Sequence, residues 1–142
     1  YTAWPASVVN ADGAPNAASV ALLAKWQRIC EIRNLVNKEI EAVRTTGAVG
    51  SSLQANVTLT VPSEDHALLA TLGDDLKFVT ITSAVTVEDG AELKITVTPA
   101  TAAKCERCWH YRDDVGAHAS HPGLCGRCVS NLYSSGEVRA IA

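Results

Sequence analysis

Two C-x-x-C pairs near the end of the chain restrict its possible folds more than any other feature. The stretch CERCWHYRDDVGAHASHPGLCGRCVSNL, residues 105–132, holds four of the five cysteines, with sixteen residues between the pairs. This spacing is typical of zinc sites, because each short turn brings two sulfur atoms close enough to share a tetrahedral ion. The pattern predicts one structural Zn²⁺, bound by Cys105, Cys108, Cys125 and Cys128.

The sequence leaves other uses of these cysteines open. Two disulfides need an oxidising compartment, a redox C-x-x-C needs a thioredoxin-like setting, and four thiols can also hold an iron–sulfur cluster. His118 or His121 could replace one cysteine as a ligand, although four cysteines already complete a tetrahedron. Four thiolates leave zinc no open position, so we expect a site that maintains the fold and performs no catalysis.

Residues within the two turns have predicted supporting roles. Gly126 suits the second turn, where we expect a left-handed backbone and close amide contacts to sulfur. Arg107 and Arg127 can offset the negative charge of zinc bound by four thiolates.

Aromatic and basic residues follow the first turn directly. Aromatic rings and guanidinium groups stack on unpaired bases, and basic side chains hold phosphates. We therefore predict an RNA-contacting surface, and the alternative is that Trp109 and Tyr111 only cover the zinc site. The predicted RNA contacts are Trp109, His110, Arg112 and Arg127.

The overall charge is mildly acidic but unevenly distributed. A net charge of −3 over 142 residues argues against bulk attraction to nucleic acid or an anionic membrane. Residues 1–103 hold seven basic and eleven acidic side chains, whereas residues 104–142 hold five and four. No segment reaches the ~20 apolar residues of a membrane span, and no signal peptide is visible. We expect a cytoplasmic protein without membrane or DNA partners, and the absence of methionine indicates a fragment of a longer chain.

The clearest helix is predicted over residues 19–44, with Ser19 or Asn16 as its N-cap and Gly47 and Gly50 ending it. A spacing of four, three, four and three residues places one set of side chains on a single face. That face consists of Leu22, Trp26, Ile29, Arg33, Val36, Ile40 and Val43.

Two residues of this helix need separate interpretation. Arg33 interrupts the apolar face, either as a snorkelling or ion-paired side chain or as a basic group directed at RNA or a neighbouring domain. Cys30 is interpreted as a small buried apolar residue. Before the helix, residues 1–18 read as an irregular lead-in that Trp4 could anchor to a surface.

The middle of the chain predicts a small unit of β-α-β-β order without a glycine-rich phosphate loop. Asp89-Gly90 predicts a hairpin between its last two strands. The predicted elements are strand 53–61, helix 64–72, and strands 77–87 and 92–100.

The predicted fold class is therefore α+β, with a long helix, the β-α-β-β unit and a four-cysteine zinc ribbon or knuckle. We expect three parts. These are residues 1–50 with the lead-in and long helix, residues 51–103 as a small α+β subdomain, and residues 104–142 as the zinc-binding module.

Several motifs resemble one family, the bacterial-type isoleucyl-tRNA synthetases. KCERCWHYRDDVG, LCGRCVSNL and GEVRAIA are similar to the C-terminal zinc-binding segment of that family. WQRICEIRNLVNKEIEAVR and GAVGSSLQANVTL resemble the end of its anticodon-binding helical region and the stretch that follows, and FVTITSAVTV also fits. The resemblance covers nearly the whole chain, in the right order, and includes all four cysteines.

The resemblance implies a region that helps to hold the anticodon stem-loop of tRNA(Ile), next to the remaining domains of the parent synthetase. The family's catalytic signatures H-I-G-H and K-M-S-K-S do not occur in this sequence, so the fragment alone is not expected to join isoleucine to tRNA with ATP. One alternative is a purely structural zinc module that packs on the parent enzyme. Another is the zinc ribbon of a formamidopyrimidine-type DNA glycosylase, but SHPGLC lacks the arginine and aromatics expected before the third cysteine.

Overall fold

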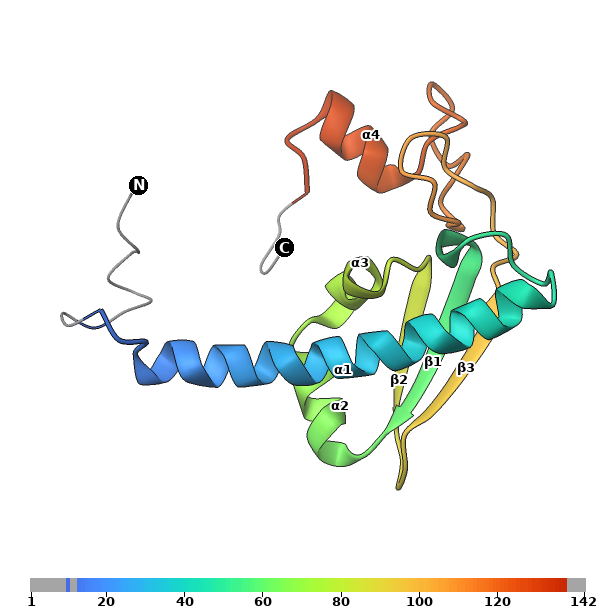
Figure 1. The fold of residues 1–142 in the computed structure, drawn as a ribbon. Helices are drawn as coiled ribbons and strands as arrows, with labels where there is room; N and C mark the ends of the chain where they lie inside the picture. Colours follow the sequence, from blue (N-terminus) through green and yellow to red (C-terminus); the bar gives the residue numbers. More distant parts are fainter. Residues whose placement is uncertain (1–9, 11–12, 138–142) are drawn as a thin grey trace.

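The computed structural model describes residue 10 and residues 13–137, so Trp4 and most of the predicted lead-in lie outside the described residues. The fold is mixed α/β, with a long helix across a three-stranded sheet and the cysteine-rich segment beyond the sheet end where the central strand begins (Figure 1). Its elements are α1 (Ala17–Thr45), β1 (Ala55–Val61), α2 (Ser63–Ala70), α3 (Leu76–Thr80), β2 (Ala84–Asp89), β3 (Lys94–Pro99) and α4 (Gly126–Tyr133). Within the described residues, no helix is both long and apolar enough to span a bilayer.

Helix α1 matches its predicted range within a few residues. Its N-cap is Asn16, whose Oδ1 accepts a hydrogen bond from the backbone amide of Ser19 at 2.8 Å. At the other end Gly47 has φ +79°, a left-handed conformation that costs glycine little, and its amide bonds to the carbonyl of Arg44 at 3.0 Å. Of the two predicted N-caps, Asn16 is therefore the one used.

The buried face of α1 differs in part from the predicted one. Leu22 is 53% exposed, whereas Ile32, which the predicted face omits, is buried. Arg33 is half-buried and its Nε donates to the carbonyl oxygen of Val79 at 2.8 Å, so it holds α1 to α3. The buried residues of the helix are Ile29, Ile32, Val36 and Ile40. The predicted face extended too far because the first turns of α1 carry no residue of the buried core.

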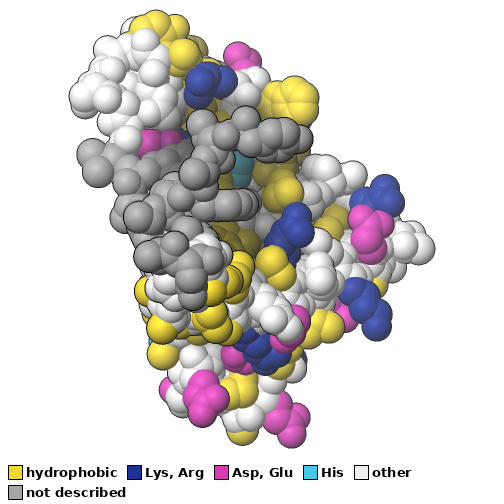
Figure 2. Space-filling view, turned by 60° about the vertical axis from the view of Figure 1, so that its left-hand side comes forward, with side chains coloured by type: hydrophobic (Ala, Val, Ile, Leu, Met, Phe, Trp, Pro, Cys, Tyr) yellow, Lys and Arg dark blue, Asp and Glu magenta, His cyan; other side chains and the backbone are white. Residues whose placement is uncertain are grey.

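The N-terminal end of α1 leaves apolar side chains exposed, namely Val20, Leu22 and Leu23. This end is turned toward the viewer in Figure 2, where hydrophobic side chains gather on the surface. The prediction for Cys30 was wrong, since its side chain is exposed. Cys30 lies about 100° around the helix from Ile29 and therefore points away from the sheet.

The sheet order is β2-β1-β3, so the predicted hairpin between β2 and β3 was wrong. The first strand lies between them and pairs parallel with β2 and antiparallel with β3. The Asp89-Gly90 turn passes over the end of β1, where the Gly90 amide donates to the carbonyl of Val61 at 2.9 Å. A Cβ at Gly90 would lie 2.3 Å from Thr60 Cγ2, so the glycine leaves room for the Thr60 side chain at this crossing.

The predicted strand 77–87 is also corrected, because its first part is helix α3 and the strand begins only at Ala84. Leu69, Leu72 and Leu76 are buried at helical spacing, and this apolar face continues into the β-branched run. Ile81 adopts φ 57° and ends the helix before β2. The predicted strands 53–61 and 92–100 and helix 64–72 are confirmed as β1, β3 and α2. The β-α-β-β order holds with one addition, helix α3 between α2 and β2.

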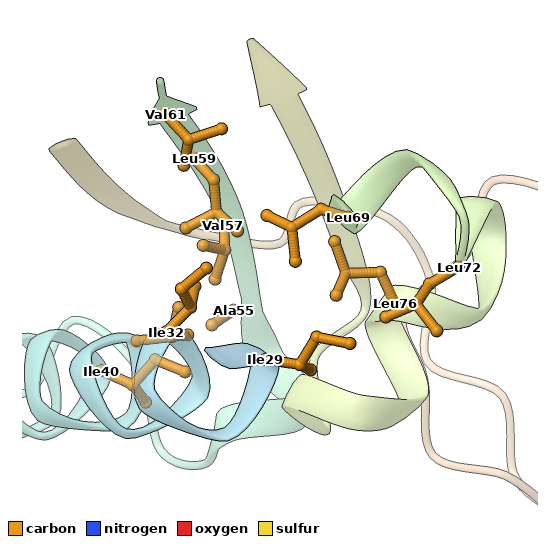
Figure 3. Packing of buried hydrophobic residues seen from close by; sticks show 11 residues of the cluster. Ile29, Ile32, Ile40, Ala55, Val57, Leu59, Val61, Leu69, Leu72 and Leu76 are labelled. Carbon is orange, nitrogen blue, oxygen red and sulfur yellow. The ribbon is translucent and has the colours of Figure 1, made fainter. Parts of the chain in front are cut away.

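One aliphatic core joins the helices to one face of the sheet. Alternate residues of β1, from Ala55 to Val61, are buried and point toward α1, α2 and α3 (Figure 3). Side chains of β2 and β3 cover the edges of this core. None of the cysteines near the C-terminus belongs to it; three of them form a second buried cluster of their own.

Candidate metal centre

Two short turns bring the four cysteines together. Before the first turn, Lys104 and Tyr111 form an isolated antiparallel bridge, and the Cys105 amide donates to the carbonyl of His110 at 2.9 Å. In the second turn Cys125 is the N-cap of α4, and Cys128 lies in the first turn of this helix. A looped segment and a helix start therefore each contribute two sulfur atoms.

The sulfur geometry fits a tetrahedral ion. All four Sγ atoms lie within 4.8 Å of one another, and Cys108 Sγ and Cys125 Sγ are 3.7 Å apart. Zn–S bonds of ~2.3 Å require separations of about 3.7–3.8 Å, so the observed spacing leaves room for one zinc ion. The sulfurs lie close without being joined, since all five cysteines are free thiols. Three of the four clustered residues are buried and Cys108 is half-buried.

Three thiols of the cluster differ in how readily they lose their protons. Burial works to raise the pKa of Cys105, but backbone N–H groups of Cys108, Cys125 and Arg107 lower it to about 6. Burial raises the pKa of Cys108 to about 12 and also raises that of Cys125. Cys105 thus loses its proton more readily than Cys108 or Cys125. Zinc binds cysteine as the thiolate, so metal binding would release protons from the cluster.

The residues predicted to support the metal act differently from one another. Arg107 Nη1 lies 3.6 Å from Cys128 Sγ, as expected for a cation that offsets thiolate charge. Arg127 instead pairs with Glu137, with Nε 2.6 Å from Oε2.

Gly126 is needed for a different reason from the predicted one, because its φ is not left-handed. Its amide donates to Asp114 Oδ2 at 2.9 Å, and a Cβ there would approach the same oxygen to 3.0 Å. A side chain at position 126 would therefore have to displace the Asp114 carboxylate.

Trp109 is the most exposed of the predicted RNA contacts, with 58% of its surface accessible. Its backbone adopts φ 65°, a conformation that costs a non-glycine residue about 1–3 kcal/mol and that clusters at functional sites. Its indole Nε1 donates to the carbonyl of Glu106 at 3.2 Å, and the ammonium of Lys104 lies 5.2 Å from the ring centroid. The ring is thus held in place on the surface.

His110 and Arg127 are residues of the zinc module that pack against α3. The His110 ring meets the edge of Phe78, with centroids 5.5 Å apart, and the Arg127 guanidinium lies 4.6 Å from the same ring. Burial lowers the pKa of His110 and the charges of Arg127 and Lys77 lower it further, against the opposing hydrogen bond with the Cys108 backbone. Its Nε2 is buried without a hydrogen-bond partner among the described residues.

Arg112 is less exposed than Trp109 and is paired. Its Nε donates to Asp114 Oδ1 at 3.0 Å, so Arg112 and the Gly126 amide share one carboxylate. Hydrogen bonding to the Gly126 amide and to Arg112 lowers the pKa of Asp114 against the opposing effect of burial.

Sequence reasoning missed two residues that join the module to the sheet. Ser83 Oγ accepts from the Tyr111 amide at 2.6 Å and donates to the carbonyl of Leu53 at 2.5 Å. Phe78, the only phenylalanine, packs against His110 and Arg127. A lone aromatic in an otherwise aliphatic unit was the available signal for Phe78, but nothing in the sequence marks Ser83.

The two histidines considered as alternative ligands lie outside the cluster of described ligand atoms. His121 is half-buried and stacks on Tyr133, with ring centroids 4.0 Å apart and planes within 5° of parallel. His118 is exposed.

A protein-family model described as a zinc finger found in FPG and IleRS matches residues 103–131, the segment that contains all four clustered cysteines. The fold and the site therefore define a class, a small α/β unit that carries a four-cysteine zinc finger with one structural zinc.

Curated relatives make the assignment more specific. The chain is 57% identical to the isoleucine–tRNA ligase of Thiobacillus denitrificans over 118 residues, which cover 83% of this chain and 13% of the relative. It is 54% identical to that of Bordetella petrii over 126 residues, 88% of this chain and 13% of the relative. With the ligase of Burkholderia multivorans the identity is 50% over 145 residues, 100% of this chain and 14% of the relative. The chain is thus a counterpart of isoleucyl-tRNA synthetases along most of its length, consistent with their C-terminal region, and spans only about an eighth of these relatives.

Proposed function

We propose that this chain is the C-terminal tRNA-binding region of a cytoplasmic isoleucyl-tRNA synthetase, the enzyme that attaches isoleucine to tRNA(Ile) with ATP. In this proposal the region contacts the anticodon side of the tRNA, while the reaction takes place on other domains of the parent enzyme. The similarity to isoleucine–tRNA ligases supports the assignment of the parent.

Within the proposal, Cys105, Cys108, Cys125 and Cys128 are the zinc ligands. Their sulfur atoms lie within 4.8 Å of one another, and four thiolates satisfy zinc completely. The metal would supply folding free energy and no chemistry of its own, because no coordination position is left for water or substrate.

The observation that carries the RNA role is the conformation of Trp109. An exposed indole on a strained backbone, beside the metal site, costs stability without filling a core. Such a ring is suited to stack on an unpaired base, which is worth about 1–3 kcal/mol. We propose Trp109 and Arg112 as direct RNA contacts, and His110 and Arg127 stay predictions in that role.

Binding of tRNA(Ile) by the zinc-loaded chain tests the proposal, with a non-cognate tRNA as the comparison and measurements at two salt concentrations. Trp109→Leu should weaken binding by about 1–3 kcal/mol, whereas Trp109→Phe should retain most of it, because phenylalanine keeps an aromatic face. Zinc content must be equal in all three proteins. Equal affinity of the leucine and tryptophan proteins, or no salt-sensitive binding, would contradict the RNA role.

A second candidate function is a purely structural zinc module that packs on the parent enzyme. The packing of His110 and Arg127 against Phe78 favours it, since these groups connect the module to the α/β unit. Footprinting of tRNA on the parent synthetase, with and without this region, distinguishes the two. A structural module predicts an unchanged footprint, and the RNA role predicts lost protection in the anticodon arm.

A further inference from the structure

Lys104 differs from the other basic side chains that the structure describes in the zinc module. Arg112 pairs with Asp114 and Arg127 pairs with Glu137, and Arg107 faces the sulfur of Cys128. No carboxylate of the described residues lies within ion-pair distance of Lys104. Its positive charge is therefore not neutralised within the described part of the chain.

The position of Lys104 is fixed by its neighbours on both sides. Its backbone bridges to Tyr111, and Cys105 follows it directly at the buried metal cluster. Its ammonium lies 5.2 Å from the centroid of the Trp109 ring, within the range of a cation–π contact. The exposed lysine side chain thus extends over an exposed aromatic ring.

The indole ring itself is restrained in three ways. The left-handed backbone at Trp109 sets the direction of the side chain, and the bond from Nε1 to the Glu106 carbonyl fixes its rotation. The Lys104 ammonium lies over the ring, and 58% of the tryptophan surface stays accessible to solvent. A flat aromatic surface beside an unpaired cation is complementary to the two parts of a stacked nucleotide. The ring can stack on the base, and the cation can pair with the phosphate.

We propose that Lys104 is an RNA phosphate contact that acts together with Trp109, so that the pair binds one unpaired nucleotide of a single-stranded RNA loop. The proposal rests on the proposed RNA role of Trp109 and names a partner for it. In it, Trp109 stacks on the base and Lys104 neutralises an adjacent phosphate, a division of roles that suits single-stranded RNA. Arg112, which also bonds to Asp114 next to the second turn, keeps its proposed RNA contact beside this pair.

The salt dependence of binding separates this role from a purely structural one. A lysine that neutralises one phosphate releases counterions, so affinity falls as salt rises. For single-stranded nucleic acid, loss of one such contact reduces the magnitude of the slope of log affinity against log salt by about 0.7. Lys104→Met keeps an unbranched side chain over the indole and removes the charge. Lys104→Arg keeps the charge.

The control is Lys94→Met, which removes an equal charge from an exposed position on β3. Lys94 pairs in register with Thr60 near the end of β1, whereas the zinc module joins the sheet at the start of that strand through Ser83. The two variants therefore have the same net charge but differ in where the charge was lost.

The experiment titrates the zinc-loaded chain with an RNA hairpin that carries the anticodon loop of tRNA(Ile), at several salt concentrations and with NMR detection. Lys104→Met should lower the slope by about 0.7, while Lys104→Arg and Lys94→Met should keep the original slope. An unchanged slope for Lys104→Met, or an equal fall for Lys94→Met, would overturn the inference. If Trp109→Leu still weakens binding in that case, the proposed function stands and only the role of Lys104 fails. If the unmodified chain does not bind the hairpin at all, both fail together.

Discussion

At the scale of single residues, an ion pair outside the metal site joins the first two helices. Arg28 donates two hydrogen bonds to Asp65, from Nε to Oδ1 at 2.9 Å and from Nη2 to Oδ2 at 2.7 Å. These bonds hold the pKa of Asp65 below its ordinary value, although burial opposes them. Because the Asp65 side chain is 11% exposed and that of Arg28 42%, the pair is partly screened by solvent.

Asp65→Asn should therefore lower the free energy of unfolding by about 1 kcal/mol at neutral pH. The folded-state pKa of Asp65 is depressed, so its contribution is fully present above the unfolded-state pKa and disappears as pH falls through the folded-state pKa. Urea denaturation of both proteins at neutral and strongly acidic pH checks this. A stability difference that persists undiminished below the folded-state pKa of Asp65 would contradict it.

Single residues also show what a sequence can and cannot reveal. The four clustered cysteines were identifiable because ligand spacing is a local property of the chain. The contacts of Phe78 with His110 and of Ser83 with Tyr111 join residues about thirty positions apart, and no local pattern encodes such pairings. Cys30 was mispredicted because a step of one residue, about 100° around the helix, decides between core and solvent.

At the scale of elements, β1 is the centre of the α/β unit. It is hydrogen-bonded on both edges, to β2 and to β3, and its alternate residues are buried under the helices. The strand itself was predictable from its alternation. The order of the sheet was not, because Asp89-Gly90 marks a close crossing over β1 and a hairpin turn has the same sequence signature.

Leu59→Ala on this strand should lower the free energy of unfolding by about 2–5 kcal/mol, because Leu59 is 0% exposed and the substitution leaves a cavity. Leu23→Ala is the matched control. Leu23 is 65% exposed on α1, so the same substitution should change stability by less than about 0.5 kcal/mol. Chemical denaturation of both variants provides the comparison, and similar losses would show that the core is not centred on β1.

At the scale of the whole molecule, two buried clusters share no residue. The aliphatic cluster joins α1, α2, α3 and the sheet, and the second cluster contains Cys105, Cys125 and Cys128 with the half-buried residues packed on them. The predicted division into residues 1–50, 51–103 and 104–142 stays a prediction. The separate clusters do indicate that the metal supports only the C-terminal part directly.

Removal of zinc by a chelator should therefore unfold the module and leave the helix–sheet core in place. The NMR signals of residues 104–137 should lose their dispersion, while those of α1 and β1 persist. Loss of the α1 and β1 signals at the same chelator concentration would show that the two clusters fold as one cooperative unit.

The central claim is that four thiolates hold one structural zinc ion, and metal analysis tests it most directly. The unmodified chain should contain one zinc per chain, and Cys30→Ser should retain it because Cys30 lies on α1, outside the clustered thiols. Cys108→Ser and Cys125→Ser should each lose tight binding, and cobalt in place of zinc should give the absorption of a tetrahedral four-thiolate complex. A ratio well below one zinc per chain, or full zinc content in the Cys108→Ser and Cys125→Ser proteins, would contradict the account.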